Sequence, residues 1–311
     1  MKRKITTIKR MVSFGLILVM TLTGMNVYAA ELDVNTDDII DEQESATSIT
    51  YNVETGEITY GNAEDYILED VDSAELNGVN GEEISPTGII GPDDRIMVSN
   101  TTVYPYNAIC YVESTFPDGN VKRGTGSLVY STVMLTAGDM VYSHNHGGWA
   151  KSVMVVPALN SDGQNRPYGT AHSTTITSNS QWTENKSIEW DWAIVDLDKS
   201  FSSWLGVSYN KNYTLYIGLK ASTVGYPSDK GFQMWQDTNS ISAAGERYLK
   251  ILCDTQAGDS GAPVMALESG KIAGIIVTEY KENDVYFYNG AVRINADLYS
   301  RIKAHIDEVQ Q

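Results

Sequence analysis

Cysteine is scarce in this chain of 311 residues, which contains only Cys110 and Cys253. Each lies in an apolar, strand-like stretch, so two buried free thiols and one bridge both remain open. The chain has four histidines and no Cys-x-x-Cys or histidine-rich spacing of the kind that holds structural zinc. The sequence therefore predicts no disulfide framework, no metal site and no cofactor.

Long apolar runs are absent after the first 30 residues. These begin with the basic segment MKRKITTIKR, continue with the apolar MVSFGLILVMTLTGM, and reach a small-residue cleavage pattern at Val27-Tyr28-Ala29. A retained anchor is the alternative, but the apolar run is shorter than the roughly 20 residues that a span needs. We expect a signal peptide over residues 1–29 and a secreted, extracellular protein without a stable membrane anchor.

Lysine and arginine are absent from residues 31–88, which carry 17 Asp and Glu. The formal net charge is −18; without these 17 negative charges and the five positive charges of the first 30 residues, −6 remains for residues 89–311. Such a leader buries little core, so a pro-segment over residues 30–88 and a disordered acidic spacer both fit. The abrupt change at residue 88 to an aromatic-rich pattern favours the pro-segment. The acidic main domain has no Lys/Arg stripe, which argues against nucleic-acid binding.

Short runs rich in Val, Ile, Thr and Tyr recur through residues 89–311, separated by clusters of Gly, Pro, Asn, Asp and Ser. This spacing is typical of an all-β sandwich or barrel. The end of the chain differs, because NADLYSRIKAHIDEV places Leu298, Ile302 and Ile306 on one helical face behind a possible cap at Asn295. The sequence predicts an all-β fold that closes with one C-terminal α-helix.

The strongest chemical signal is AGDSGAPV around Ser260. Flanking glycines allow a sharp turn that exposes the hydroxyl and aims the amides of Gly258 and Ser260 at one point, as an oxyanion hole requires. An ordinary glycine-rich turn is the competing explanation. Asp191, in EWDWAIVDL, stands at the edge of an apolar strand, where it could orient an imidazole or simply begin a strand.

Residues 89–311 resemble the secreted glutamyl endopeptidases of the Bacillus type, within the chymotrypsin-like serine proteases. The resemblance rests on IIGPDDRIMVSNTTVYPYNAI, LTAGDMVYS, DWAIVDL, VGYPSDK, MWQDT and DTQAGDSGAPV, which occur in this order. It implies a monomer with two six-stranded β-barrels, over residues 89–200 and 201–311, and a peptide or protein bound in the cleft between them. It also implies interaction with the chain's own pro-segment and peptide-bond hydrolysis through an acyl-enzyme at Ser260.

The family motif that supplies the general-base histidine reads TAGDM here, with Asp139 at the histidine position. A carboxylate is shorter than an imidazole, and its ordinary pKa near 4 makes it a weak base at neutral pH. Facing Asp191, it would form a carboxyl pair of which one member holds a proton. We expect an impaired serine endopeptidase, or alternatively an inactive pseudoprotease that binds or regulates. His144 and His146 are possible substitute bases, although solvated loop histidines are the simpler interpretation.

The specificity pocket implied by the resemblance comprises Asp254, Thr255, Val277 and Thr278. Val277 stands where the family has a histidine that contacts a substrate glutamate, so that contact is lost. Thr255 keeps a hydroxyl expected in the pocket, and Asp254 lies where trypsin-like relatives attract a basic side chain. In the same relatives, the aspartate before the nucleophile pairs with the N-terminal amine that zymogen cleavage frees. Asp259 would take that role here after cleavage near Gly88.

Overall fold

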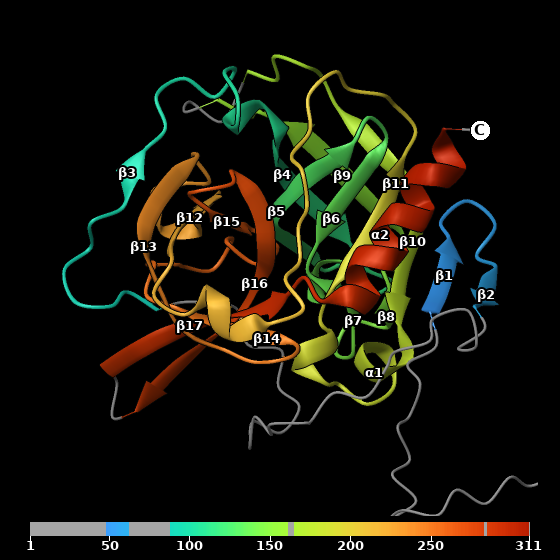
Figure 1. Ribbon diagram of the computed structural model, residues 1–311. Helices are drawn as coiled ribbons and strands as arrows, with labels where there is room; N and C mark the ends of the chain where they lie inside the picture. The colour runs from blue at the N-terminus through green and yellow to red at the C-terminus, as the bar shows by residue number, and fades with distance from the viewer. Residues whose placement is uncertain (1–47, 62–87, 161–164, 283–284, 311) are drawn as a thin grey trace, which may run out of the picture. The chain divides into compact units, whose positions relative to one another are not determined.

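The computed structural model describes residues 48–61, 88–160, 165–282 and 285–310. The predicted signal peptide, its cleavage site and much of the acidic leader lie outside these residues. Two antiparallel sheets, each closed into a barrel, make up the described main domain (Figure 1). The predicted all-β, double-barrel fold with a C-terminal helix is confirmed.

The first barrel closes where β10 pairs with β11. Its strands are rich in β-branched residues, whose side chains fill a continuous apolar core. A separate two-stranded ribbon, β7 (Tyr142–Ser143) with β8 (Gly148–Trp149), follows β6. The barrel strands are β4 (Ile109–Thr115), β5 (Val121–Tyr130), β6 (Val133–Thr136), β9 (Ser152–Pro157), β10 (Ala171–Asn179) and β11 (Ala193–Leu197).

The second barrel closes where β12 pairs with β13. A short strand from before the first barrel, β3 (Ile96–Met97), adds to β13 and so ties the start of the main domain to the second barrel. The barrel strands are β12 (Lys220–Gly225), β13 (Trp235–Ala244), β14 (Tyr248–Ile251), β15 (Pro263–Ala266), β16 (Lys271–Glu282) and β17 (Val285–Arg293).

The C-terminal helix α2 (Ala296–Val309) returns to the first barrel, where it lies beside β10 and β11 (Figure 1). Asn295 caps it by accepting a hydrogen bond from the Leu298 N–H at 3.0 Å, as the sequence predicted. Leu298 and Ile302 are buried in the same core cluster as the first barrel. Within the described residues, no helix has the length and apolarity needed to cross a bilayer.

A second, short helix, α1 (Ser180–Thr183), begins directly where β10 ends. Asn179 closes β10 and caps α1, its side chain accepting the N–H of Trp182 at 3.1 Å. This junction fixes the indole of Trp182 near the turn after β6.

Part of the acidic leader forms a hairpin, β1 (Ser48–Asn52) and β2 (Ile58–Tyr60). Strand β1 pairs antiparallel with β10, from Ser48 opposite Asn179 to Asn52 opposite Thr175. A wholly disordered acidic spacer, one of the two alternatives that composition left open, is therefore wrong for these residues. Composition missed the hairpin because charge averages over the leader hide the uncharged stretch SITYNV.

The two cysteines, one in each barrel, are both free and buried. Burial raises the pKa of the Cys253 thiol to about 12, so the thiol stays protonated and unreactive. The structure therefore favours two buried thiols over a bridge.

Candidate active site

The nucleophile loop is held by two glycines in left-handed backbone conformations, Gly258 at φ +104° and Gly261 at φ +86°. A Cβ added at Gly258 would lie 2.3 Å from the Tyr226 carbonyl oxygen, and one at Gly261 would lie 2.0 Å from that of Thr125. Only glycine fits either position without displacing backbone. Ser260, between them, is only 1% exposed, so the prediction of an exposed hydroxyl is wrong.

Thr125 on β5 fastens this loop to the first barrel. Its N–H donates to the Ser260 carbonyl at 2.9 Å, and its hydroxyl donates to the Gly258 carbonyl at 2.8 Å. Within the part of the chain that the structure describes, the N–H groups of Gly258 and Ser260 have no protein acceptor, whereas those of Asp259 and Gly261 do. Two neighbouring amides thus remain available to an anionic oxygen.

Asp139 lies against the Ser260 hydroxyl. It sits in a 3-10 turn, Gly138–Met140, directly after β6, and it is almost completely buried. Ser260 Oγ lies 2.9 Å from both Asp139 Oδ1 and Asp139 Oδ2 and donates its hydrogen to this carboxylate. Asp139 therefore occupies the place beside the serine that the sequence analysis assigned to it.

A further charged side chain, Lys122, which the sequence analysis did not single out, also contacts Asp139. Lys122 Nζ on β5 lies 2.6 Å from Asp139 Oδ2, so the carboxylate is shared between an ammonium and a hydroxyl. The β5–β6 register pairs Gly126 with Thr136, and counted on past the end of β6 it would set Arg123, not Lys122, opposite Asp139. Because the chain turns at Gly138–Met140, strand register alone does not identify the lysine as the partner.

Asp191 stabilises the Gly138–Met140 turn by a hydrogen bond to its backbone. It follows a 3-10 turn at Ile188–Trp190, and its Oδ1 accepts the backbone N–H of Asp139 at 2.7 Å. Burial, and secondly the charge of Asp139, raise the pKa of the Asp191 carboxyl well above its usual range. The expected carboxyl pair is thus a contact between the Asp191 carboxyl and the Asp139 backbone.

We expect the contributions of Lys122 and Asp139 to the free energy of unfolding to be coupled, because the two side chains form an ion pair. Lys122→Met should destabilise the protein by about 2 to 3 kcal/mol at neutral pH, because it leaves the buried Asp139 carboxylate without its counter-ion. Combining Lys122→Met with Asp139→Asn should recover most of that loss, since both charges are then gone. Urea unfolding of the unmodified chain, both single variants and the double variant measures this coupling. Simple additivity of the two effects would contradict the proposed ion pair.

Neither candidate substitute base is directed at the serine. His146 Nδ1 lies 2.8 Å from Asp118 Oδ2 on the surface. The His144 ring packs between Tyr142 and Trp182, with centroid distances of 5.1 and 5.3 Å. Ser260 Oγ is bonded to Asp139, and no described hydrogen bond joins it to either imidazole.

Two of the four residues predicted for the specificity pocket line a common pocket, and the other two contact the segment that begins at Gly88. Val277 and Thr278 line a pocket of about 110 Å³ between β14, β16, β17 and the Ile188 turn, which Asp254 and Thr255 do not line. Asp254 Oδ1 instead accepts the N–H of Ile90 at 2.7 Å. The Thr255 N–H donates to the Gly88 carbonyl at 3.1 Å.

Asp259 is buried, and its Oδ2 accepts the N–H of Gln256 at 2.8 Å. Burial raises the pKa of the Asp259 carboxyl to about 7. In this uncut chain the segment after Gly88 reaches Asp254 through Ile90, as described above. Asp259 is therefore a buried acid that holds a proton through much of the acidic and neutral range.

The stability of the protein should fall as pH rises from about 4 to 7, because the folded state keeps a proton on Asp259 that the unfolded chain releases. Asp259→Asn keeps the acceptor for Gln256 and removes the ionisation. At pH 8 this variant should be more stable than the unmodified chain by about 4 kcal/mol, and at pH 4 the two should be nearly equal. Thermal unfolding across this pH range checks the prediction, and a Tm difference independent of pH would contradict it.

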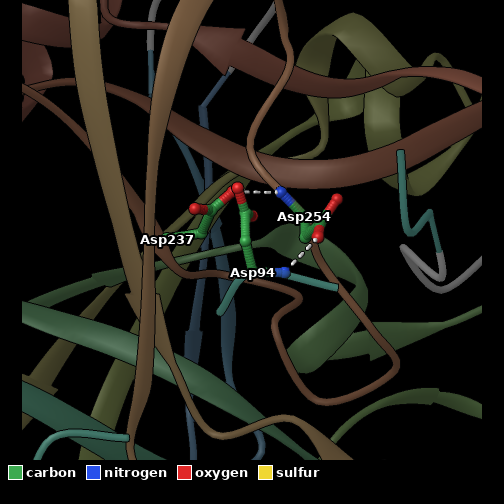
Figure 2. A group of neighbouring side chains, drawn as sticks. All are labelled: Asp94, Asp237 and Asp254. Atoms are coloured by element: carbon green, nitrogen blue, oxygen red, sulfur yellow. Dashed lines mark hydrogen bonds between the residues drawn. The ribbon is translucent and has the colours of Figure 1, made fainter. Parts of the chain in front are cut away.

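Three carboxylates form the one cluster of metal-ligating type within the described residues, with ligand atoms within 4.8 Å of one another. Figure 2 shows Asp237 accepting the Asp254 N–H at 2.7 Å and Asp254 facing the Asp94 N–H at 3.4 Å. Carboxylate oxygens alone suit hard cations, and the cluster lacks the nitrogen or sulfur ligands usual in catalytic zinc sites. None of the three belongs to the Ser260 cluster.

Comparison with known proteins agrees with this geometry. A family model described as a trypsin-like peptidase domain matches residues 124–275. The chain is 34% identical over 231 residues to the extracellular metalloprotease of Bacillus subtilis, covering 72% of this chain and 71% of that protein. It is 28% identical over 270 residues to the glutamyl endopeptidase of Bacillus licheniformis, covering 82% and 83%.

A solved structure of a Glu endopeptidase in complex with MPD superimposes with a TM-score of 0.61, covering 70% of this chain and 98% of that one at 24% identity. At this identity the superposition supports the fold alone. The family follows from the matched peptidase domain, the sequence relatives and the Ser260 loop between two closed barrels. The chain belongs to the chymotrypsin-like serine protease family and carries a trypsin-like serine protease domain related to the glutamyl endopeptidases.

Proposed function

We propose that this chain is a secreted peptide-binding member of its family whose hydrolase chemistry is silenced at neutral pH by the carboxylate at position 139. One observation carries the proposal: Ser260 Oγ donates to Asp139, with both carboxylate oxygens at 2.9 Å, and Asp139 is paired with Lys122 at 2.6 Å. The serine is positioned but lacks an imidazole base.

The chemistry follows from the proton balance. Acylation requires a base that takes the Ser260 proton as Oγ attacks a carbonyl carbon and then gives it to the leaving amine. An aspartate carboxylate accepts a hydrogen bond but binds a proton weakly at neutral pH. The Lys122 ammonium further stabilises the negative charge of Asp139. A bound peptide would therefore remain uncut, while the two free amides of the loop could still hold its carbonyl oxygen.

A second candidate is slow hydrolysis by Ser260, and the preserved nucleophile loop favours it. Gly258 and Gly261 keep the positive φ angles that present two amides to an oxyanion. In a comparable enzyme, loss of the base leaves a residual acceleration of about 10³ to 10⁴ over water. That residual comes from the oxyanion hole and substrate binding, so only turnover that Ser260→Ala abolishes would belong to Ser260.

The name of the Bacillus subtilis relative describes a metalloprotease. In this chain, the described cluster Asp94, Asp237 and Asp254 offers oxygen ligands alone, which does not fit a catalytic zinc centre. The proposed chemistry rests on Ser260 and the amides of its loop.

The proposed ligand is an extended peptide without a strong preference for glutamate. Val277 is apolar, and the pocket it lines with Thr278 also contains charged side chains of both signs, so an acidic side chain is not singled out. These charged residues are Lys250, Glu189 and Glu279. Secretion is proposed from the basic, apolar and small-residue order of the first 30 residues. The name of the Bacillus subtilis relative, which describes an extracellular protein, supports it.

Fluorescein-labelled unfolded casein, incubated with the full chain, separates the two candidates. The silenced-binder proposal expects a rise in anisotropy that saturates, with intact casein on a gel after a day. Fragments that disappear with Ser260→Ala would favour slow hydrolysis, whereas absence of any anisotropy change would overturn peptide binding.

A further inference from the structure

The edge of β10 beyond residue 174 is covered by the leader and by no strand of the barrel itself. Strand β9 pairs with β10 only at Ala171 and His172, and β11 occupies the opposite edge. From Thr175 to Asn179 the partner is β1. Without β1, this edge would present unpaired backbone groups along residues 175–179, TITSN.

The docked strand fits this edge with side-chain contacts as well as backbone pairing. Thr50 Oγ1 and Thr177 Oγ1 lie 2.8 Å apart, and the Val53 N–H extends the ladder by donating to the Thr174 carbonyl at 3.0 Å. Ile49 is buried, at 4% exposed. By contrast, all three residues of β2 are exposed, so β1 makes the attachment.

Tyr51 gives the attachment its specificity. Its ring stacks on Trp149 of β8 with centroids 5.4 Å apart and an interplanar angle of 8°. Tyr51 and Val53 also pack against the main core cluster. Strand, aromatic stack and buried isoleucine together form a recognition surface of the kind used in β-strand addition.

A series of ring contacts connects Tyr51 to the Gly138–Met140 turn that carries Asp139, which we call the catalytic turn. Trp149 contacts Tyr142 at 5.1 Å, Tyr142 contacts His144 at 5.1 Å, and His144 contacts Trp182 at 5.3 Å. The Trp182 ring lies over the turn itself, because a Cβ added at Gly138 would be 2.8 Å from it.

A second route reaches Trp182 along the backbone. Ser48 of β1 is paired with Asn179, and Asn179 caps the helix that carries Trp182. Tyr51, through the ring contacts, and Ser48, through Asn179, therefore both connect β1 to Trp182. Trp182 in turn packs against Gly138, next to Asp139.

We propose that the β10 edge and the Trp149 face form a binding site for an extended strand, that leader residues 48–61 occupy it without needing a covalent link, and that their docking holds the turn at Asp139. The inference does not depend on the proposed function, because it concerns strand binding and backbone protection. A leader cut from the main domain would remain as a bound strand, and its release would loosen the turn.

The test uses the full chain with a site-specific protease sequence inserted between residues 61 and 88, cut after folding. The leader fragment should co-elute with the main domain on gel filtration at 10 µM, a concentration on the order of that at which micromolar complexes persist. A fluorescent peptide of residues 48–61 should exchange into the cut protein. Tyr51→Ala should weaken retention at least tenfold, whereas Tyr60→Ala, on exposed β2, should not. Separation of the unmodified leader, or equal behaviour of the two variants, would overturn the binding site.

Hydrogen exchange supplies the readout for the catalytic turn. When the cut leader is released by dilution, the amides of Ile176 and Ser178, which the alternation of the antiparallel ladder points toward β1, and the Asp139 amide should exchange at least tenfold faster. The amide of Ile194, in the middle of β11, should be unchanged. Faster exchange at β10 with no change at Asp139 would overturn the proposed hold on the turn.

Discussion

Replacing Asp139 with histidine should raise kcat/KM for peptide hydrolysis by at least about 10³, because an imidazole at this position can take and return the Ser260 proton. The remaining machinery is in place: Ser260 lies at the site, and Asp191 already bonds the backbone of residue 139. We expect less than the roughly 10⁶ attributed to a complete triad, since the Lys122 ammonium opposes a protonated imidazole.

Two further variants test whether this increase in kcat/KM comes from the imidazole at position 139. Asp139→Asn has nearly the shape of aspartate and no base, and it should stay inactive. Asp139→His combined with Lys122→Gln should exceed Asp139→His alone, since the opposing ammonium is removed. Fluorogenic peptide hydrolysis at pH 8 measures all of them, with Ser260→Ala in the histidine background as the blank. Equal rates for the asparagine and histidine variants would contradict the assigned role of position 139.

Gly261→Ala should destabilise the protein by about 4 kcal/mol or more, enough to unfold many domains. The backbone has φ +86°, and the added Cβ would lie 2.0 Å from the Thr125 carbonyl oxygen and 2.3 Å from Thr136 Oγ1. Neither neighbour can withdraw easily, because both belong to strands of the first barrel. The strain should also disturb the Ser260 loop.

Gly119→Ala is the matched control. Gly119 has nearly the same φ, +88°, but a Cβ there would meet nothing within 4 Å. It should therefore cost only the backbone strain, about 1 kcal/mol. Comparing the urea unfolding midpoints of the two variants separates the cost of backbone strain from the cost of the steric clash of the added Cβ. A similar loss of stability in the two would show that the close approach of Thr125 and Gly261 is not what restricts the loop.

The sequence was sufficient for the elements whose evidence is local. Short apolar runs such as AICYVES predicted strands, and this one corresponds to β4, Ile109–Thr115. Asn295 and the Leu298 stripe predicted the final helix. The motif around Ser260 predicted a glycine-bounded loop, and both glycines take positive φ. These features depend on backbone propensity and period, which neighbouring residues determine.

The parts that the sequence missed depend on residues distant along the chain. Lys122 pairs with Asp139 in the turn that follows β6, and Asp254 accepts the N–H of Ile90 from the far end of the domain. The leader strand recognises β10 more than a hundred residues later, so average composition could not reveal it. Electrostatic partners of this kind are fixed by tertiary packing rather than by motif.

The central claim is that a carboxylate at position 139 leaves Ser260 positioned but unreactive. The most direct measurement is the intact mass of the full chain after treatment with a fluorophosphonate at pH 7, beside Asp139→His and Ser260→Ala. The account predicts no adduct on the unmodified chain, one adduct on Asp139→His, and none once Ser260 is replaced. A single adduct at Ser260 of the unmodified chain, formed as fast as on Asp139→His, would contradict it.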